Sequence, residues 1–205
     1  MNLKKLFEMQ RILDEHIMNE HPELRGKNNL DWKILALQVE LGECANEWRG
    51  FKKWSKNQEP RNKDIECHAC KGKGKFVVDV DHFKAIYEEC GYCDGAGIQE
   101  KNPLLMEYVD CLHFILSIGL EIKDTEFDEN DMNEYINSGD ESDLIKQFSF
   151  LFWVAAELGE NIFHYKQMLY EFIDLGKNLG FSWGKIEQAY LDKNKVNHQR
   201  QETGY

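Results

Sequence analysis

Two C-x-x-C pairs constrain this sequence more than any other feature. They are Cys67 with Cys70 and Cys90 with Cys93; nineteen residues separate the pairs, and two spaced glycines follow each pair. This spacing is typical of a four-cysteine zinc site and favours zinc over reduced or disulfide-linked thiols. Four thiolates would fill the coordination shell and leave no position for a substrate. The pattern therefore predicts a structural Zn²⁺ site.

The cysteines lie in a segment whose composition differs from the rest of the chain. A polar stretch with Pro60 opens it, and residues 76–80 form the β-like run FVVDV. A segment with so few apolar residues needs its metal to fold. We therefore predict a zinc-ribbon-like module at residues 57–102, inserted into a helical domain made of residues 1–56 and 103–205.

Outside this module, apolar residues recur every three or four positions, as they do on the buried face of an α-helix. The 205 residues are 42% hydrophobic, which is enough for one domain with a core. We expect an all-α fold, a bundle of five or six helices. The helices are predicted at residues 3–20, 31–54, 104–122, 143–163 and 164–179, and from Ser182 onward.

The chain is acidic, with 37 Asp and Glu residues against 25 Lys and Arg residues and a net charge of −12. Residues 121–146 alone contribute −8, and we interpret them as a solvated acidic connector. The cysteine module is near neutral, with seven basic and eight acidic residues between positions 61 and 101. Neither segment has the basic surface that a nucleic-acid polymer requires.

We expect neither a membrane span nor a secretion signal. The opening residues MNLKKLFEMQRILDEHI carry charges throughout, and no apolar run approaches the roughly 18 residues of a spanning helix. The sequence therefore predicts a cytoplasmic protein, where paired cysteines bind metal more often than they form disulfides.

Two pairs of acidic residues lie on the helices that flank the module. Glu40 and Glu43 are on the first helix, Glu107 and Asp110 on the second, and residues three apart share a helix face. If these helices pack side by side, four carboxylates converge, and a divalent cation such as Mg²⁺ or Mn²⁺ would relieve their repulsion. Ordinary surface acids are the alternative, and the pattern alone does not separate the two.

Several segments resemble the dimeric, all-α dUTP diphosphatases, a branch of the all-α nucleoside triphosphate pyrophosphatases that also includes the MazG-type enzymes. The segments occur in the family's order and span nearly all of the chain except the cysteine module and the acidic connector. They are LFEMQRILDEHI (6–17), ALQVELGECANEWRGFKKWS (36–55), LLMEYVDCLHFILSIGLE (104–121), LYEFIDLGKNLGFSWGKIEQAYLDKN (169–194) and NHQRQETGY (197–205).

The resemblance implies a homodimeric hydrolase (a dUTPase) that converts dUTP to dUMP and diphosphate. Such an enzyme of nucleotide metabolism clears dUTP from the nucleotide pool and supplies the precursor of dTMP; dUDP is a second candidate substrate. The resemblance also implies that Glu40, Glu43, Glu107 and Asp110 bind catalytic Mg²⁺. Glu40 or Glu43 would then be the catalytic residue that orients or deprotonates the attacking water.

The resemblance further implies a set of substrate-binding residues. Gln10 matches the position that reads the pyrimidine. Lys193, Asn197 and Arg200 fall on one face of the last helix, where the two cations could meet phosphate. The full set is Gln10, Lys52, Trp54, Tyr190, Lys193, Asn194, Asn197 and Arg200.

Several of these positions also have structural interpretations. Gln10 could be an exposed helix glutamine, and the C-terminal run could be a basic helix end followed by a frayed tail. Lys52 and Trp54 could equally be a helix-end cation and a core aromatic residue. His113, one turn after Asp110, is better interpreted as a hydrogen-bonded interior histidine than as a catalytic one.

The cysteine module is the main departure from the family, because it places Glu43 and Glu107 64 positions apart. It could cover the substrate entrance, brace a dimer or contact another protein, and the sequence does not rank these roles. Two other functions stay open. One is a related pyrophosphatase with a different nucleotide preference, and the other is an interaction or regulatory protein on a degenerate enzyme scaffold.

Overall fold

The computed structural model describes residues 2–81, 84–138 and 143–204 of the chain. Within these residues it contains seven α-helices, so the all-α prediction is confirmed. The helices are α1 (Leu3–Glu20), α2 (Leu30–Trp48), α3 (Pro103–Glu121), α4 (Glu129–Ser138), α5 (Leu144–Glu157), α6 (Tyr165–Asn178) and α7 (Trp183–Thr203), with 3₁₀ turns η1 (Pro22–Leu24) and η2 (Ile162–His164).

The central helix of the bundle is α3. It packs against α1, α2, α6 and α7, and side chains on all of its sides are buried, including those of Leu104, Tyr108 and Leu112. The helix begins where the cysteine module ends, because Pro103 fits its first turn and the Asn102 side chain accepts a hydrogen bond from the Leu105 N–H at 3.1 Å. Acidic residues on α3 therefore face neighbouring helices.

By length and composition, α3 is also apolar enough to cross a membrane, which differs from the expectation drawn from the sequence. The mean hydropathy of its most apolar window is 1.4, and 72% of that window is buried inside the bundle. A helix that is apolar on all sides is also what the core of a helical bundle requires. This feature alone is therefore weak evidence for a membrane span.

The second helix ends earlier than its apolar periodicity predicted. α2 ends at Trp48 instead of near Trp54, because Arg49 adopts a left-handed conformation with φ of 65°. Its N–H still donates to the Ala45 carbonyl at 2.9 Å, which caps the helix. Residues 50–54 consequently lie in the turn beyond α2.

The acidic segment 121–146 is more ordered than the solvated connector that its composition predicted. It contains α4, which packs on α6. Met132 and Ile136 are four positions apart, and both contribute to the core; Met132 is fully buried. A few apolar residues at helical spacing thus suffice to bury one face of a mostly acidic segment. Two other acids of the segment, Asp140 and Glu141, lie outside the described residues.

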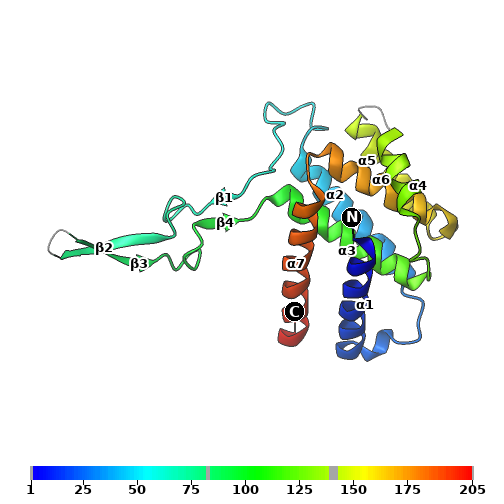
Figure 1. The fold of residues 1–205 in the computed structure, drawn as a ribbon, viewed down its shortest axis with the longest axis horizontal. Coiled ribbons are helices and arrows are strands. Elements are labelled where there is room, and N and C mark those ends of the chain that lie inside the picture. Colours follow the sequence, from blue (N-terminus) through cyan, green and yellow to red (C-terminus); the bar gives the residue numbers. More distant parts are fainter. Residues whose placement is uncertain (1, 82–83, 139–142, 205) are drawn as a thin grey trace.

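The strands form an arm that extends away from the helices (Figure 1). β1 (Ile65–Glu66) pairs with β4 (Ile98–Glu100), and β2 (Lys75–Asp81) pairs with β3 (Lys84–Glu89), both antiparallel. The side chains of β2 and β3 are exposed, so this hairpin has no apolar core of its own. The four cysteines lie between the two strand pairs, where they form a buried cluster.

Candidate functional site

Acidic residues of α2 and α3 converge where these two helices lie side by side. Carboxylate oxygens of Glu40, Glu43 and Glu107 all lie within 4.8 Å of one another. The spacing of three on α2 puts two of these carboxylates on one helix face, and the packing of α3 supplies the third. Asp110, one turn further along α3, is near enough to interact electrostatically with Glu40 and Glu107.

Asp110 has a cation as its partner. Lys193 Nζ of α7 donates a hydrogen bond to Asp110 Oδ2 at 2.5 Å, and the two side chains are only 15% and 16% exposed. This contact forms because α7 packs along α3. The last helix therefore brings a positive charge to the edge of the carboxylate cluster.

Three carboxyl groups at this site have a raised pKa. Burial, reinforced by Asp110 and then Glu43, raises the pKa of Glu40 to about 7. Burial and the three other carboxylates raise the pKa of Glu107 to about 7. Burial also raises the pKa of Asp110, although its hydrogen bond to Lys193 opposes this shift. Such a cluster favours a bound cation, and a donor set made only of oxygens fits Mg²⁺ or Mn²⁺.

A cavity of about 290 Å³ lies beside the cluster, between α1, α2, α3 and α7. Glu40 and Asp110 contribute to its wall, and α7 adds Lys193, Asn197 and Arg200. Its other lining residues are Gln10, Leu13, Asp14, Ile17, Met18, Trp32, Lys33, His113, Phe114, Ser117 and Gln201. The cavity thus joins carboxylates, cations and an apolar surface with a few polar groups.

Gln10 is buried in the wall of this cavity and is held on both ends of its amide. Its Nε2 donates to Asp14 Oδ1 at 2.7 Å. Its Oε1 lies 2.8 Å from His113 Nδ1 and accepts from the Tyr190 hydroxyl, also at 2.8 Å. The rings of His113 and Tyr190 stack with centroids 4.1 Å apart. Residues of α1, α3 and α7 therefore hold Gln10 in one orientation.

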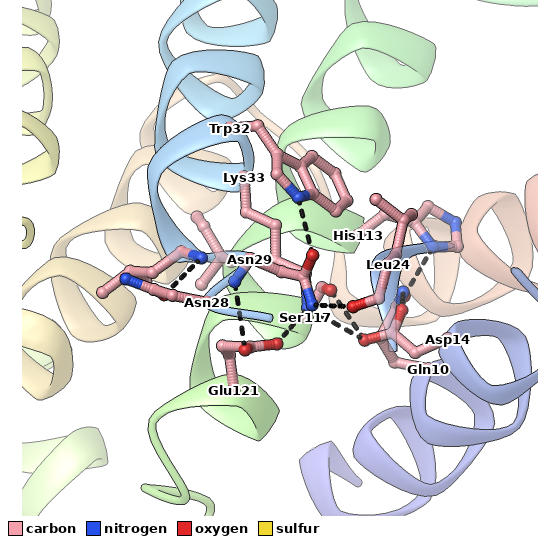
Figure 2. Close-up of polar contacts among 12 residues, drawn as sticks. Gln10, Asp14, Leu24, Asn28, Asn29, Trp32, Lys33, His113, Ser117 and Glu121 are labelled. Carbon is pink, nitrogen blue, oxygen red and sulfur yellow. Dashed lines mark hydrogen bonds and ion pairs between the residues drawn. The ribbon is translucent and has the colours of Figure 1, made fainter. Parts of the chain in front are cut away.

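Asp14 belongs in turn to a partly buried polar network, which Figure 2 shows. The Ser117 hydroxyl donates to Asp14 Oδ2 at 2.7 Å, and Lys33 Nζ lies 3.7 Å from the same oxygen. Lys33 also pairs with Glu121 Oε2 at 2.8 Å. Because Lys33 is only 3% exposed, its charge requires these partners. The network connects α1, α2 and α3 at the cavity.

The predicted substrate-binding residues of α7 divide into two groups. Lys193, Asn197 and Arg200 line the cavity from one helix face. Tyr190 and Asn194 are buried and do not line it within the described chain. Asn194 Nδ2 has no hydrogen-bond partner among the described residues.

The other two predicted substrate-binding residues, Lys52 and Trp54, do not line the cavity within the described part of the chain. Both follow the early end of α2, and Trp54 is 78% exposed, so it is not a core aromatic residue. Lys52 Nζ lies 5.7 Å from the centre of the Phe51 ring. These contacts give no support for substrate binding at either position.

Sequence reasoning missed several residues of the cavity. His113 is a hydrogen-bonded interior histidine, as interpreted, but it also lines the cavity. Asp14, one turn after Gln10, could have been found because it shares a helix face with that residue. Lys33 and Ser117 carried no such signal, because their partners lie on other helices.

The four cysteines of the arm form a second cluster of possible metal ligands. Their Sγ atoms all lie within 4.8 Å of one another, with 3.9 Å between Cys67 and Cys90 and 3.8 Å between Cys70 and Cys93. All four are free cysteines, so no disulfide competes for them. Four sulfurs bound to zinc at about 2.3 Å would lie about 3.8 Å apart. The observed spacing fits tetrahedral zinc.

The glycines after each cysteine pair allow the chain to turn tightly around the sulfurs. Gly74 and Gly97 have φ of 70° and 74°, and a Cβ at either would lie within 2.5 Å of a carbonyl oxygen in the opposite turn. Their N–H groups donate to the Sγ atoms of Cys70 and Cys93, both at 3.2 Å. Gly74 and Gly97 thus make equivalent contacts in the two turns, which explains why the C-x-x-C-x-G-x-G spacing occurs twice.

Comparison with known proteins agrees with this geometry. The family model described as dUTPase matches residues 2–84 and 95–205, which include both acidic pairs and all of α7. The unmatched residues 85–94 contain Cys90 and Cys93. Comparison with curated proteins and with solved structures gave no match. Because the family match covers nearly the whole chain, the protein belongs to the all-α, MazG-like dUTPase family and is a dUTP diphosphatase enzyme.

Proposed function

We propose that this enzyme hydrolyses dUTP to dUMP and diphosphate in a Mg²⁺-dependent reaction, and so clears dUTP and supplies the precursor of dTMP. One observation carries the proposal: Glu40 belongs both to the carboxylate cluster and to the wall of the cavity. A nucleotide in the cavity would therefore have its phosphates beside the cluster. dUDP is a second candidate substrate, because it has the same base and its phosphates would also lie beside the cluster.

Glu40, Glu43, Glu107 and Asp110 would hold the metal ions. Bound Mg²⁺ would neutralise phosphate oxygens and make a water molecule easier to deprotonate. Because Lys193 already pairs with Asp110, a cation would compete with this lysine for the same carboxylate. The ammonium group would then be available to a phosphate oxygen.

The hydrolysis requires a group that accepts a proton from water as the water oxygen bonds to phosphorus and the bridging P–O bond breaks. Glu40 and Glu43 are the candidates. Glu40 lines the cavity, whereas Glu43 is exposed and lies outside the lining within the described chain. Since a general base must reach the water that it activates, this difference favours Glu40.

The cavity face of α7 would bind the triphosphate. Lys193 and Arg200 provide positive charge, and the Asn197 amide can donate or accept a hydrogen bond. These three residues line the cavity from α7, and Glu40 lines it from α2, so the triphosphate would lie beside both the cations and the carboxylate-bound metal.

The polar groups at Gln10 suit uracil. Gln10 Nε2 has one acceptor among the described residues, Asp14, which leaves its second N–H for a ligand. His113 Nε2 has no partner in the described chain, and burial lowers the pKa of His113 to about 3, so the ring is neutral. Because Nδ1 faces the Gln10 oxygen, Nδ1 carries the proton and Nε2 is an acceptor. Uracil offers O4 as an acceptor and N3–H as a donor, whereas cytosine offers the reverse.

Two alternatives predict different results. A related pyrophosphatase with another nucleotide preference would use the same carboxylates, because the cluster contacts only phosphate. An interaction or regulatory protein on a degenerate scaffold would hydrolyse none of the nucleotides. The presence of all four carboxylates and of a formed cavity argues against lost catalysis.

The test is a hydrolysis screen over the common nucleoside and deoxynucleoside triphosphates and dUDP, with products identified, with and without Mg²⁺. We expect dUTP to give dUMP and diphosphate only when Mg²⁺ is present. Preferential cleavage of another nucleotide would establish the first alternative, and no cleavage of any would establish the second.

For the arm, we propose a structural Zn²⁺ held by Cys67, Cys70, Cys90 and Cys93, with residues 57–102 as an inserted module between 1–56 and 103–205. The sulfur spacing and the N–H groups directed at Sγ atoms support this proposal. Free cysteines suit a reducing compartment, and we accordingly propose a cytoplasmic location. Whether the module also contacts a protein partner is a question for pull-down experiments with and without it.

We also propose that the enzyme is a homodimer. Leu35 and Val39, four positions apart on α2, are 62% and 52% exposed, and Trp32 is 40% exposed on the same helix. Exposed apolar residues on one helix face are typical of a subunit interface. Sedimentation analysis should give a dimer for the wild type, and Leu35→Glu with Val39→Glu should shift it to a monomer.

A further inference from the structure

We propose that Asp14 is a positioning residue for base selection: its carboxylate fixes the orientation of the Gln10 amide and thereby makes the cavity select uracil over cytosine. This inference rests on the proposed function, because it assumes that the base lies beside Gln10. It adds a residue that does not need to touch the base and acts through Gln10.

The orientation of Gln10 follows from what its neighbours can donate and accept. A carboxylate only accepts hydrogen bonds, so the group that lies 2.7 Å from Asp14 Oδ1 must be the NH₂ end of the amide. The flipped amide would bring two oxygens together at that distance. At the other end, the Tyr190 hydroxyl and His113 Nδ1 both donate to Oε1. Both lone pairs of Oε1 are therefore used within the protein.

What Gln10 can still offer a ligand is consequently a donor and not an acceptor. Its oxygen is saturated, and its nitrogen keeps one hydrogen beyond the bond to Asp14. A ligand atom beside this amide must accept, as uracil O4 does, whereas the amino group of cytosine would face another N–H. If the amide could flip, its oxygen would face the ligand and this preference would be reversed.

Asp14 is itself held in place by groups on two other helices. Ser117 of α3 donates to its second oxygen at 2.7 Å, and Lys33 of α2 lies 3.7 Å from that oxygen (Figure 2). Burial raises the pKa of Asp14, while Lys33 and the bonds from Ser117 and Gln10 oppose that shift. Lys33 is anchored in turn by Glu121 at 2.8 Å. This support matters because a protonated Asp14 could donate, and the amide could then turn either way.

The variant that tests the inference is Asp14→Asn. Its side chain keeps nearly the same size but can present either an oxygen or an NH₂ group to Gln10, so both amide orientations become possible. We expect the ratio of kcat/KM for dUTP to kcat/KM for dCTP to fall about tenfold, which corresponds to the loss of one oriented hydrogen bond. Mg²⁺-dependent hydrolysis itself should remain.

Glu15→Gln is the matched control, because Glu15 is the next residue of α1 and its side chain is 63% exposed. This variant should keep the wild-type ratio. Ser117→Ala is the second test variant, in case Asp14→Asn does not fold, since it removes only a hydroxyl and, with it, a hydrogen bond that opposes the rise in the pKa of Asp14. It should lower the ratio in the same direction by about threefold, because Asp14 loses one of its donors.

The outcomes separate this inference from the proposed function. A wild-type enzyme that does not prefer dUTP to dCTP would refute the uracil-specific function itself. If the wild type prefers dUTP and Asp14→Asn lowers kcat/KM for both substrates by the same factor, the inference is overturned and the proposed function stands. Asp14 would then have a structural role. If Asp14→Asn is unfolded, an unchanged ratio in Ser117→Ala overturns it as well.

Discussion

Lys193 of α7 and Asp110 of α3 form an ion pair at 2.5 Å that connects the cavity lined by α7 with the carboxylate cluster. Burial raises the pKa of Asp110, whereas Lys193 and, more weakly, Arg200 stabilise its charge. The same ammonium group lines the cavity. If the proposed function is correct, Lys193 would respond both to a metal ion at Asp110 and to a phosphate in the cavity.

Replacing Lys193 should mainly weaken nucleotide binding. We expect Lys193→Ala to raise the KM for dUTP at least tenfold, because a charge-assisted hydrogen bond to phosphate contributes about 1.5–3 kcal/mol. Steady-state kinetics at saturating Mg²⁺ measure this effect. Lys195→Ala is the control, since Lys195 is an exposed lysine of the same helix. An unchanged KM in Lys193→Ala would remove this lysine from the phosphate site.

The acidic cluster should be essential for turnover but not for folding. We expect Glu43→Gln and Asp110→Asn each to lower kcat at least about 100-fold, since both remove an oxygen charge that would bind metal or act on water. Circular dichroism should show a folded protein, because neither change alters side-chain volume much. Asp31→Asn, at the exposed first turn of α2, should keep wild-type activity. Normal turnover in either cluster variant would refute the assigned metal site.

The burial of Glu107, reinforced by repulsion from the other carboxylates, predicts how its contribution to stability changes with pH. Glu107 has a pKa of about 7 in the folded protein and about 4.5 in the unfolded chain, so the folded state holds its proton more tightly. Its contribution is therefore fully present at low pH and is lost as the pH rises through 7. Without added divalent cations, Glu107→Gln should melt at a higher temperature than the wild type, and the gap should widen from pH 5 to pH 8.

The titration of His113 changes the stability with pH in the opposite direction. Because the wild type and Glu107→Gln both contain His113, its effect cancels in the difference between their melting temperatures. Its pKa is lowered to about 3 by burial, so it destabilises the folded state as the pH falls below about 6.5. Adding Mg²⁺ at pH 8 should stabilise the wild type more than Glu107→Gln. A gap in melting temperature that does not change with pH would show that Glu107 titrates normally.

Loss of zinc should affect the arm and leave the helical core folded. We expect the double variant Cys67→Ser with Cys90→Ser to contain less than a tenth of the wild-type zinc by elemental analysis, because each half of the site loses one thiolate. Limited proteolysis should cut this variant within residues 57–102, while the thermal unfolding of the helices persists. The control variant Cys44→Ser, a substitution in the bundle core, should contain as much zinc as the wild type. Equal zinc content in the double variant would remove the zinc prediction.

The local features of the sequence predicted the parts of the fold that depend on local spacing. The run at residues 3–20 predicted α1 with the bounds that it has, and FVVDV predicted most of β2. The end of α2 could not be predicted in the same way, because the apolar pattern continues to Trp54 while the backbone turns at Arg49. The helix in the acidic segment was missed because the contribution of Met132 to the core depends on tertiary packing.

The sequence by itself determined the all-α class, the two acidic pairs and the four cysteines, because each depends on residues within a few positions of one another. Only the tertiary structure decided which side chains meet in the cavity. Lys193 and Asp110 are 83 positions apart, and Tyr190 and Gln10 are 180 apart. Such contacts depend on how four helices pack. At Gln10, the hydrogen bond to Asp14 decides whether the amide offers a ligand a donor or an acceptor, and so which base we expect the cavity to recognise.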